Sequence, residues 1–359
     1  MKKLNILLLI IVTIMALYGI IMIYSASSVW AQYKFNDAFH FAKYQFIFFI
    51  ISFLCMLIVK KIDYNLYKKH SNKILLLSLI LLILVLIPGI GTLRNGSRSW
   101  FNLGLFALQP SEIYKIALII YVSDYISHHY HQMKKLRYCL KPLIVMGIGF
   151  FLIMLQPDFG SGFVMCCSIL LMIIITPFPF RYIVFLGLSG ILMIILMIIS
   201  APYRMKRIFA FLDPFQDPLG SGFQMIQSLY AIGPGGILGS GFDQSIQKHF
   251  YLPEPQTDFI FAIYLEEFGF IGGILLILLY AYLFITCFNY AKKVDDLFGS
   301  FLMIGMTSMI GIQTIINLGV VVGLFPVTGV TLPLMSYGGT SLLVTLIEIG
   351  IMYNIIKSI

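Results

Sequence analysis

The chain is organised as long apolar runs separated by short polar connections. A helix that crosses a lipid bilayer needs about 20 mainly apolar residues. Ten runs come close to that length: residues 4–24, 44–59, 74–90, 110–127, 142–156, 160–176, 182–200, 260–288, 299–321 and 335–356. The pattern predicts an all-α polytopic membrane protein in which ten transmembrane helices form a single integral membrane domain over residues 1–359.

The composition supports this class of protein and excludes others. Counting Gly but not Tyr, roughly 62% of the residues are apolar, against about 45–50% in soluble domains. Charged residues make up 11%, where about 25% is usual. Disordered, collagen-like and disulfide-stapled secreted chains are excluded, because each needs a polar, Gly-periodic or Cys-dense sequence. The five cysteines lie in or beside apolar runs, so we interpret them as small apolar core residues.

Lysine and arginine are distributed unevenly between the two sides of the predicted helices. Alternate connections, together with both ends of the chain, carry 15 of the 24 Lys and Arg residues, whereas the opposite side carries eight. Basic loops are enriched on the cytoplasmic side, so both termini are predicted to be cytoplasmic. Orientation and contact with anionic membrane lipids account for the net charge of +9, and no nucleic-acid partner is predicted.

One connection is much longer than the others. Residues 201–259 join the seventh and eighth predicted helices on the outer side, and connections longer than about 12–15 residues are usually functional or disordered. Many aromatic and aliphatic residues favour a large ordered extracytoplasmic loop. Against the positive-inside trend, Arg204, Lys206 and Arg207 stand close together in it. Because arginine binds phosphate through two parallel hydrogen bonds, this cluster favours a phosphate-bearing ligand over simple solvation.

Ionisable residues inside the predicted helices are candidates for function, because each costs at least about 2.5–3.5 kcal/mol at the bilayer centre. Glu112 and Lys115 are three residues apart and lie on one helix face, where they form a structural ion pair or bind substrate. Glu266 and Glu267 are adjacent, so they point about 100° apart and cannot both face one partner. Glu348 stands alone in the last helix, which favours a structural role.

Asp258, at the end of the long loop, is the main candidate for a catalytic base. It follows a proline-stiffened turn and is flanked by Phe259 and Phe261 at the outer rim of the eighth helix. Thr257 and Asp258 could simply cap that helix. Partial burial beside two aromatic rings would also raise the pKa of the carboxyl group of Asp258, which suits a general base.

Motifs spread from about residue 15 to the end of the chain resemble one family. They are NGSRSW (residues 95–100), QPSE (109–112) with Lys115, QPD (156–158) with Gly160, DPFQDPLGSGFQ (213–224), QSLYAIGPGG (227–236), LPEPQTDFIFA (252–262) and PVTGVTLPLMSYGG (326–339). On these motifs the chain is identified as a member of the SEDS proteins (shape, elongation, division and sporulation), polytopic glycosyltransferases that include RodA, FtsW and SpoVE.

The details of the motifs refine this resemblance. Residues 251–258 and 317–326 are more similar to the FtsW and SpoVE branch of spore-forming bacteria than to RodA. Position 256 is Gln here and His in many relatives, so a role that requires an imidazole before Asp258 does not transfer. Ser99 stands where many relatives have Arg, and the arginine of the motif is displaced to Arg98.

The resemblance implies an activity: polymerisation of lipid II, a disaccharide-pentapeptide carried on undecaprenyl pyrophosphate, at the outer face of the bacterial cytoplasmic membrane. Asp258 would be the catalytic base. The implied substrate-binding residues are Arg98, Trp100, Glu112, Lys115, Arg204, Arg207, Gln224, Glu254 and Ser336. No resident metal site is implied, although a divalent cation could share the pyrophosphate charge.

The resemblance also implies partners and leaves alternatives open. The implied partners are lipid II, the growing glycan strand and a class B penicillin-binding protein that acts as transpeptidase. One alternative is a flippase that moves lipid II across the membrane, with Glu112, Lys115, Glu266 and Glu267 along its path. Another is a scaffold that recruits the transpeptidase. The sequence leaves open whether the protein serves division, cell shape or spore cortex synthesis.

Overall fold

The structure is a computed structural model that describes residues 2–94, 96–102, 104, 107–199 and 202–358. Each of the ten apolar runs coincides with a helix: α1 (Lys2–Phe35), α2 (His40–Val59), α3 (Asn65–Leu84), α4 (Pro110–His129), α5 (Leu136–Met154), α6 (Phe159–Ile174), α7 (Phe180–Ile199), α10 (Ile260–Ala291), α11 (Leu297–Val321) and α12 (Gly339–Lys357). Among the described residues, α1, α2, α5, α10, α11 and α12 are long and apolar enough to cross a membrane. A helical, multi-pass membrane protein is thereby confirmed.

Several helices have boundaries that differ from the predicted runs, and the largest differences are in α1 and α3. α1 continues to Phe35 instead of ending near residue 24. α3 begins at Asn65, so that Lys68, Lys69 and Lys73, predicted in a loop, belong to the helix. Lysine is a good helix former, and its stem can lie on apolar surface while the ammonium group reaches water. Charge therefore marks the side of the membrane but not the end of the helix.

The long connection between α7 and α10 contains elements that the apolar runs do not predict. These are α8 (Pro202–Leu212), a short 3-10 helix η2 (Pro214–Gln216) and α9 (Phe223–Gly235). An irregular segment, residues 236–259, leads from α9 to α10. A further 3-10 helix, η1 (Tyr130–Lys134), follows α4. Short helices thus form most of the first part of the long connection, and an irregular segment forms the second part.

The connection between α3 and α4 forms a small antiparallel sheet. Its strands are β1 (Gly91–Arg94), β2 (Ser97–Asn102) and β3 (Ala107–Leu108), in the order β1-β2-β3. The hydroxyl group of Thr92 donates to the carbonyl of Trp100 at 3.0 Å. Asn95, the first residue of the NGSRSW motif, lies outside the described residues. Pro110 begins α4 as the sequence predicts, because its fixed φ suits the first turn of a helix.

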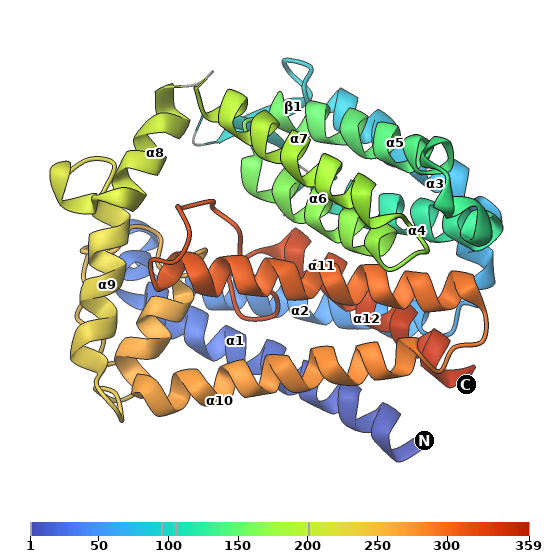
Figure 1. Cartoon of the computed structure of the whole chain (residues 1–359). Coiled ribbons are helices and arrows are strands. Elements are labelled where there is room, and N and C mark those ends of the chain that lie inside the picture. The colour runs from blue at the N-terminus through green and yellow to red at the C-terminus, as the bar shows by residue number, and fades with distance from the viewer. Residues whose placement is uncertain (1, 95, 103, 105–106, 200–201, 359) are drawn as a thin grey trace.

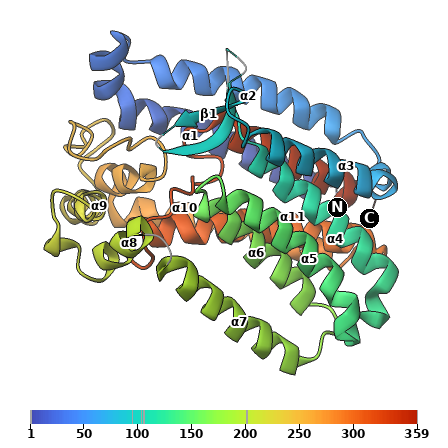
Figure 2. The same ribbon diagram turned by 90° about the horizontal axis from the view of Figure 1, so that it is seen from above.

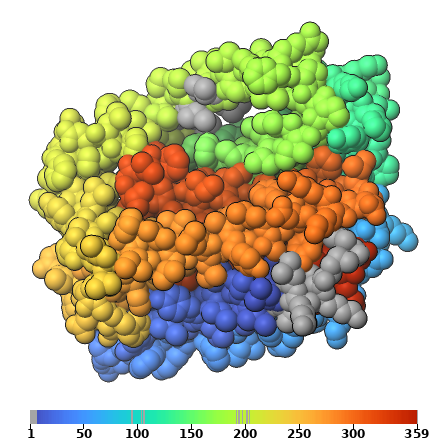
Figure 3. All heavy atoms as spheres, turned by 60° about the horizontal axis from the view of Figure 1, so that its bottom comes forward, coloured from blue at the N-terminus to red at the C-terminus, as the bar shows by residue number. Residues whose placement is uncertain are grey.

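Both chain termini lie at one end of the bundle, and α8 and α9 lie at the opposite end, in Figure 1 and in Figure 2. α11 is largely buried and packs against α4, α6, α10 and α12. Figure 3 shows α10 and α1 side by side across one outer face. Apolar side chains exposed on α10, such as Phe270, Leu275 and Leu278, suit contact with lipid tails.

α10 bends sharply at Gly269, whose φ is 63° and ψ is −164°. A Cβ atom at Gly269 would lie 2.4 Å from the Gly239 nitrogen and 2.6 Å from the Ile237 oxygen, so the preceding connection packs directly against the bend. The sequence marks residues 260–288 as one apolar run and does not indicate the bend. Glu266 and Glu267 lie before the bend, against the connection, and not along the long straight part of the helix.

Candidate functional site

Cations of α8 face a pocket of about 470 Å³. Lys206 and Arg207 form part of one wall, and Gln224, at the start of α9, forms part of another. Pro253 and Val327, which are distant in the sequence, complete the lining together with apolar residues of α8 and α9. Cations between apolar walls suit an anionic head group that is attached to a lipid.

Arg207 is oriented by the backbone of the connection between α11 and α12. Its Nη1 donates to the Val327 carbonyl at 3.0 Å. A guanidinium group has five N–H donors, so this bond fixes the direction of the side chain and leaves donors for an anion. Arg204 lies three residues earlier on α8 and is half-buried, so it shares a helix face with Arg207.

Asp258 lies just before α10 and is half-buried. The hydroxyl oxygen of Thr257 is 2.9 Å from Asp258 Oδ1 and 2.7 Å from the carbonyl oxygen of Glu254. A hydroxyl group has one proton, so Thr257 donates to one of these acceptors at a time. The next two side chains, Phe259 and Ile260, are fully buried and anchor the segment.

The surroundings of Asp258 act on its carboxyl group in opposite directions. Burial raises the pKa of Asp258 above its ordinary value of 3.8, while the Thr257 hydrogen bond lowers it. The charge of Glu254 raises this pKa, and the charge of Arg207 lowers it. Glu254 and Arg207 are therefore within electrostatic reach of Asp258. A partly desolvated carboxylate beside a cation is suited to accept a proton from a substrate.

The ion pair predicted between Glu112 and Lys115 is present and buried. Lys115 Nζ lies 2.7 Å from Glu112 Oε1 and 3.3 Å from the Gln313 side-chain oxygen on α11. Lys115 is 1% exposed. Glu348, expected to stand alone, is close enough for its charge to interact with both members of the pair. The structure therefore brings these four side chains together inside the bundle, and the substrate-binding roles of Glu112 and Lys115 stay predictions.

Ser336, Arg98 and Trp100 have protein partners of their own. The Ser336 hydroxyl accepts the Leu332 backbone N–H at 2.8 Å and thereby closes a turn before α12. Arg98 donates to the carbonyl of Leu86 at 3.4 Å, next to the end of α3. Trp100 lies in β2, paired in register with Thr92. Binding of substrate by these three residues stays a prediction.

Glu266 and Glu267 hold the segment before α10 in place. Glu266 accepts hydrogen bonds from the Ser245 hydroxyl at 2.5 Å and from the Ile246 backbone at 2.8 Å. Glu267 accepts from the Ser25 hydroxyl of α1 at 2.5 Å, and Lys248 lies 3.9 Å away. These partners belong to the connection and to α1, so both carboxylates are bonded to groups of the protein itself.

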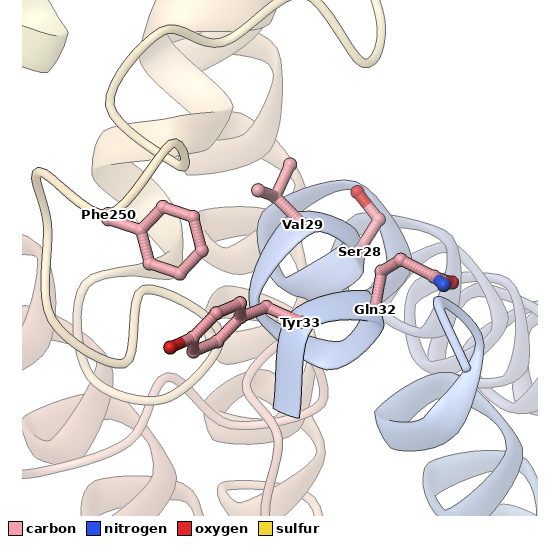
Figure 4. A pocket seen from close by; sticks show the side chains of 5 residues that line it. All are labelled: Ser28, Val29, Gln32, Tyr33 and Phe250. Atoms are coloured by element: carbon pink, nitrogen blue, oxygen red, sulfur yellow. The ribbon is translucent and has the colours of Figure 1, made fainter. Parts of the chain in front are cut away.

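A second hollow, of about 440 Å³, lies where the end of α1 meets Phe250. Figure 4 shows the rings of Tyr33 and Phe250 close to Val29, with Ser28 and Gln32 on the other side of the helix end. Its lining residues include no carboxylate and no cation. The pocket lined by Lys206 and Arg207 is thus the better candidate for group transfer. Among the described residues, no group of three or more His, Cys, Asp or Glu side chains is placed to hold a metal ion.

Two uncharged amides of α11, Asn317 and Gln313, support the site. Asn317 donates to the Asp258 carbonyl at 2.7 Å and to the Val330 carbonyl at 2.8 Å. Gln313, one turn earlier, donates to the Thr331 carbonyl at 3.1 Å. The available signal is an amide inside an apolar run, which is costly to bury without partners. Asn317 and Gln313 carry no charge, so the rule that ionisable residues inside helices are functional candidates does not identify them.

The whole chain matches a known family. A family model described as FTSW_RODA_SPOVE, cell cycle protein, matches residues 5–359. The chain belongs to this family. It is 49% identical to stage V sporulation protein E of Bacillus subtilis, over 97% of this chain and 96% of that protein. It is 40% identical to a probable peptidoglycan glycosyltransferase FtsW of Trichlorobacter lovleyi, over 98% of this chain and 92% of that protein.

Solved structures of FtsW/RodA/SpoVE type agree with this family. One chain, from work described as "Structural coordination of polymerization and crosslinking by a peptidoglycan synthase complex", has a TM-score of 0.82 at 29% identity, covering 98% of this chain and 97% of that one. Thermus thermophilus rod shape determining protein RodA has a TM-score of 0.70 at 25% identity, covering 98% and 96%. The resemblance seen in the sequence motifs is confirmed.

Proposed function

We propose that the protein is a peptidoglycan glycosyltransferase that joins lipid II units into glycan strands at the outer face of the bacterial cytoplasmic membrane. The observation that carries this proposal is the half-buried Asp258 carboxylate, within electrostatic reach of Arg207 at a pocket with cationic and apolar walls. Relatives named probable peptidoglycan glycosyltransferase FtsW support the activity.

The proposed step is a substitution at the anomeric carbon of the donor sugar. The acceptor hydroxyl oxygen forms a bond to this carbon, while the bond to undecaprenyl pyrophosphate breaks and the pyrophosphate takes the electron pair. Asp258 accepts the hydroxyl proton. Pyrophosphate is a good leaving group, so it does not need the second carboxylic acid that a glycosidase supplies. Arg207 and Arg204 stabilise the developing negative charge.

The other candidate residues divide into two groups in this proposal. Gln224 lines the pocket and Glu254 adjoins Asp258, so both contact the sugars. Glu112, Lys115 and Ser336 support the site from inside the bundle, where each is bonded to other protein groups. Arg98 and Trp100 shape the sheet that precedes α4. If polymerisation depends on a divalent cation, that cation would share the negative charge of the pyrophosphate.

The membrane topology is part of the same proposal. Ten spans with both termini in the cytoplasm place residues 201–259 outside, next to the lipid-linked substrate. The basic asymmetry supports this orientation, and so does the position of both termini at the end of the bundle opposite α8 and α9 (Figure 1). A class B penicillin-binding protein is the proposed transpeptidase partner. The match to a chain from work on a complex that coordinates polymerization and crosslinking supports it.

Topology is testable by cysteine labelling in intact protoplasts after replacement of the five native cysteines. Leu219 is 89% exposed and Leu66 is 49% exposed. A cysteine at 219 is expected to react with an impermeant reagent from outside, whereas one at 66 reacts only after lysis. Ser245 is buried and would be protected on either side. Labelling of a cysteine at position 66 in intact protoplasts would refute the proposed orientation and support the opposite one.

The activity is tested with purified protein, labelled lipid II and the transpeptidase partner, with and without Mg²⁺ and EDTA. We expect glycan polymer that a muramidase digests. A flippase would instead move lipid II between the leaflets of vesicles without forming polymer. A scaffold would bind the transpeptidase and do neither. Either of these two results would refute the proposed reaction.

A further inference from the structure

Asn317 is a buried amide near the C-terminal end of α11 that bonds to two separate segments of the chain. It is 1% exposed. Both of its N–H groups are used, one for the carbonyl of Asp258 at 2.7 Å and one for the carbonyl of Val330 at 2.8 Å. Its side-chain oxygen is buried and has no hydrogen-bond partner among the described residues. The contribution of Asn317 to the structure therefore comes from its two donors.

The first donor fixes the backbone that carries the proposed base. The Asp258 carbonyl belongs to the residue just before Phe259, which caps α10. Two residues earlier, the Gln256 carbonyl accepts the backbone N–H of Tyr337 at 2.8 Å. The segment 256–258 is thus tied to α11 and to the connection before α12. Movement of this segment would carry the Asp258 carboxylate with it.

The second donor fixes the backbone that orients the pocket cation. Val330 lies three residues after Val327, whose carbonyl accepts the Arg207 guanidinium at 3.0 Å. Gly329, between them, has a φ of 74°, a conformation that glycine adopts without strain. One amide group therefore joins the segment that carries the carboxylate to the segment that holds the guanidinium.

We propose that Asn317 is a positioning residue that fixes the Asp258 carboxylate relative to the Arg207 guanidinium. The proposal rests on the proposed glycosyltransferase function. Transfer needs the base at the acceptor hydroxyl and the cation at the leaving pyrophosphate at the same time. Misplacement of a catalytic group by about 1 Å can cost about 100-fold in rate, so a bond between the two supporting segments is a means of holding that geometry.

The test compares three variants of the full-length protein with its transpeptidase partner. Asn317→Leu removes both donors at similar volume. Asn317→Gln keeps both donors on a longer arm. Thr314→Val is the matched control, because Thr314 is equally buried on α11 and its hydroxyl donates at 2.8 Å to Ile310, within the same helix.

We expect Asn317→Leu to lower kcat by about 10- to 100-fold, with the KM for lipid II within about twofold of wild type. Asn317→Gln should recover part of the loss, and Thr314→Val should match wild type. Hydrogen exchange of peptides covering residues 254–259 should accelerate in Asn317→Leu while α11 stays protected. Thermal unfolding in detergent identifies any variant that fails to fold.

Each outcome decides the proposal. Unchanged kcat and unchanged exchange in Asn317→Leu would overturn it, as would a general loss of protection that Asn317→Gln does not relieve. If wild-type protein forms no polymer, the proposed function fails. In that case the exchange at residues 254–259 still shows whether Asn317 holds the segment.

Discussion

Two parts of the long connection use their charges in opposite ways. In residues 202–225, which we call the cationic arm, Lys206 and Arg207 line the pocket. In residues 236–258, the clamped arm, Lys248 is 4% exposed, pairs with Asp243 and lies 3.9 Å from Glu267. The cation of the clamped arm is neutralised within the protein, whereas the cationic arm presents its charge to the pocket.

The carboxylates of Asp258 and Glu266, at and just after the end of the clamped arm, also differ in their hydrogen-bond donors. Glu266 accepts bonds from a hydroxyl group and from backbone N–H groups of Ile246 and Gln247. Asp258 shares the single proton of Thr257 with another acceptor. Protein donors thus occupy both oxygens of the Glu266 carboxylate, whereas the Asp258 carboxylate keeps acceptor capacity for a substrate hydroxyl. The number of donors, and not burial alone, distinguishes a structural acid from a candidate base.

The largest effect is expected for Asp258→Asn. It keeps the size of the side chain and one acceptor oxygen but removes the basic carboxylate. A general base contributes typically about 10²–10⁴-fold, whereas the side chain of Asp258 makes no cap bond to α10, whose N-cap is Phe259. The variant should fold and bind lipid II and the transpeptidase, yet form no detectable glycan in a polymerisation assay. Substantial polymer from Asp258→Asn would mean that another carboxylate, such as Glu254 or Asp217, is the base.

A double substitution tests whether the buried ion pair of Glu112 and Lys115 is structural, as we infer for Lys248 in the clamped arm. Lys115→Met leaves Glu112 unpaired and should cost about 3–5 kcal/mol of stability. Glu112→Gln with Lys115→Met should recover folding and most of the activity, because Lys115 is 1% exposed and bonded within the bundle. Thermal unfolding and polymer yield are measured on the same samples. Recovered folding without activity would instead mean that Lys115 binds phosphate.

Arg207→Gln and Lys248→Met test the comparison between the two arms directly. Loss of a hydrogen bond to a charged group costs about 1.5–3 kcal/mol, so Arg207→Gln should reduce kcat/KM by about 10- to 100-fold at unchanged stability. Lys248→Met should lower the free energy of unfolding by about 1–3 kcal/mol, with little change in kcat/KM per folded molecule. The reverse assignment of effects would refute the division into two arms.

The smallest effect is expected for Thr257→Val, which removes the hydroxyl that hydrogen-bonds Asp258 Oδ1. That bond lowers the pKa of Asp258 against the effect of burial, so its removal should raise this pKa. The base is active when deprotonated. The acid limb of the kcat/KM profile should therefore move to higher pH, with activity on the alkaline plateau retained. An unmoved acid limb would mean that a different group limits activity at low pH.

The parts of the fold and site that the sequence predicts are those with a local signal. Apolar runs mark the ten helices, spacing marks the pair of Glu112 and Lys115, and the position of Asp258 at the start of an apolar helix marks its partial burial. The bend at Gly269 has no such signal, because it depends on contact with Gly239, a distant residue. The partners of Glu266 and Glu267 have no local signal either, because they lie on α1 and on the connection before α10.

The cations of the long connection show a further limit of prediction from sequence. Arg207 and Lys248 both stand in the long connection, and sequence position alone cannot distinguish the cation at the pocket from the neutralised one. Asn317 and Gln313 carry no charge and are not found by a search for ionisable residues. Their partners, Asp258, Val330 and Thr331, come from segments whose proximity is set by the packing of α11 against the rest of the bundle.

The single proton of Thr257, shared between Asp258 Oδ1 and the Glu254 carbonyl, has a consequence for the reaction cycle. When the carboxylate gains a proton, the hydroxyl can rotate to Glu254 without any movement of heavy atoms. When the carboxylate loses the proton, the hydroxyl can rotate back. In the proposed mechanism, the site can thus change its charge at each addition of a sugar with little reorganisation.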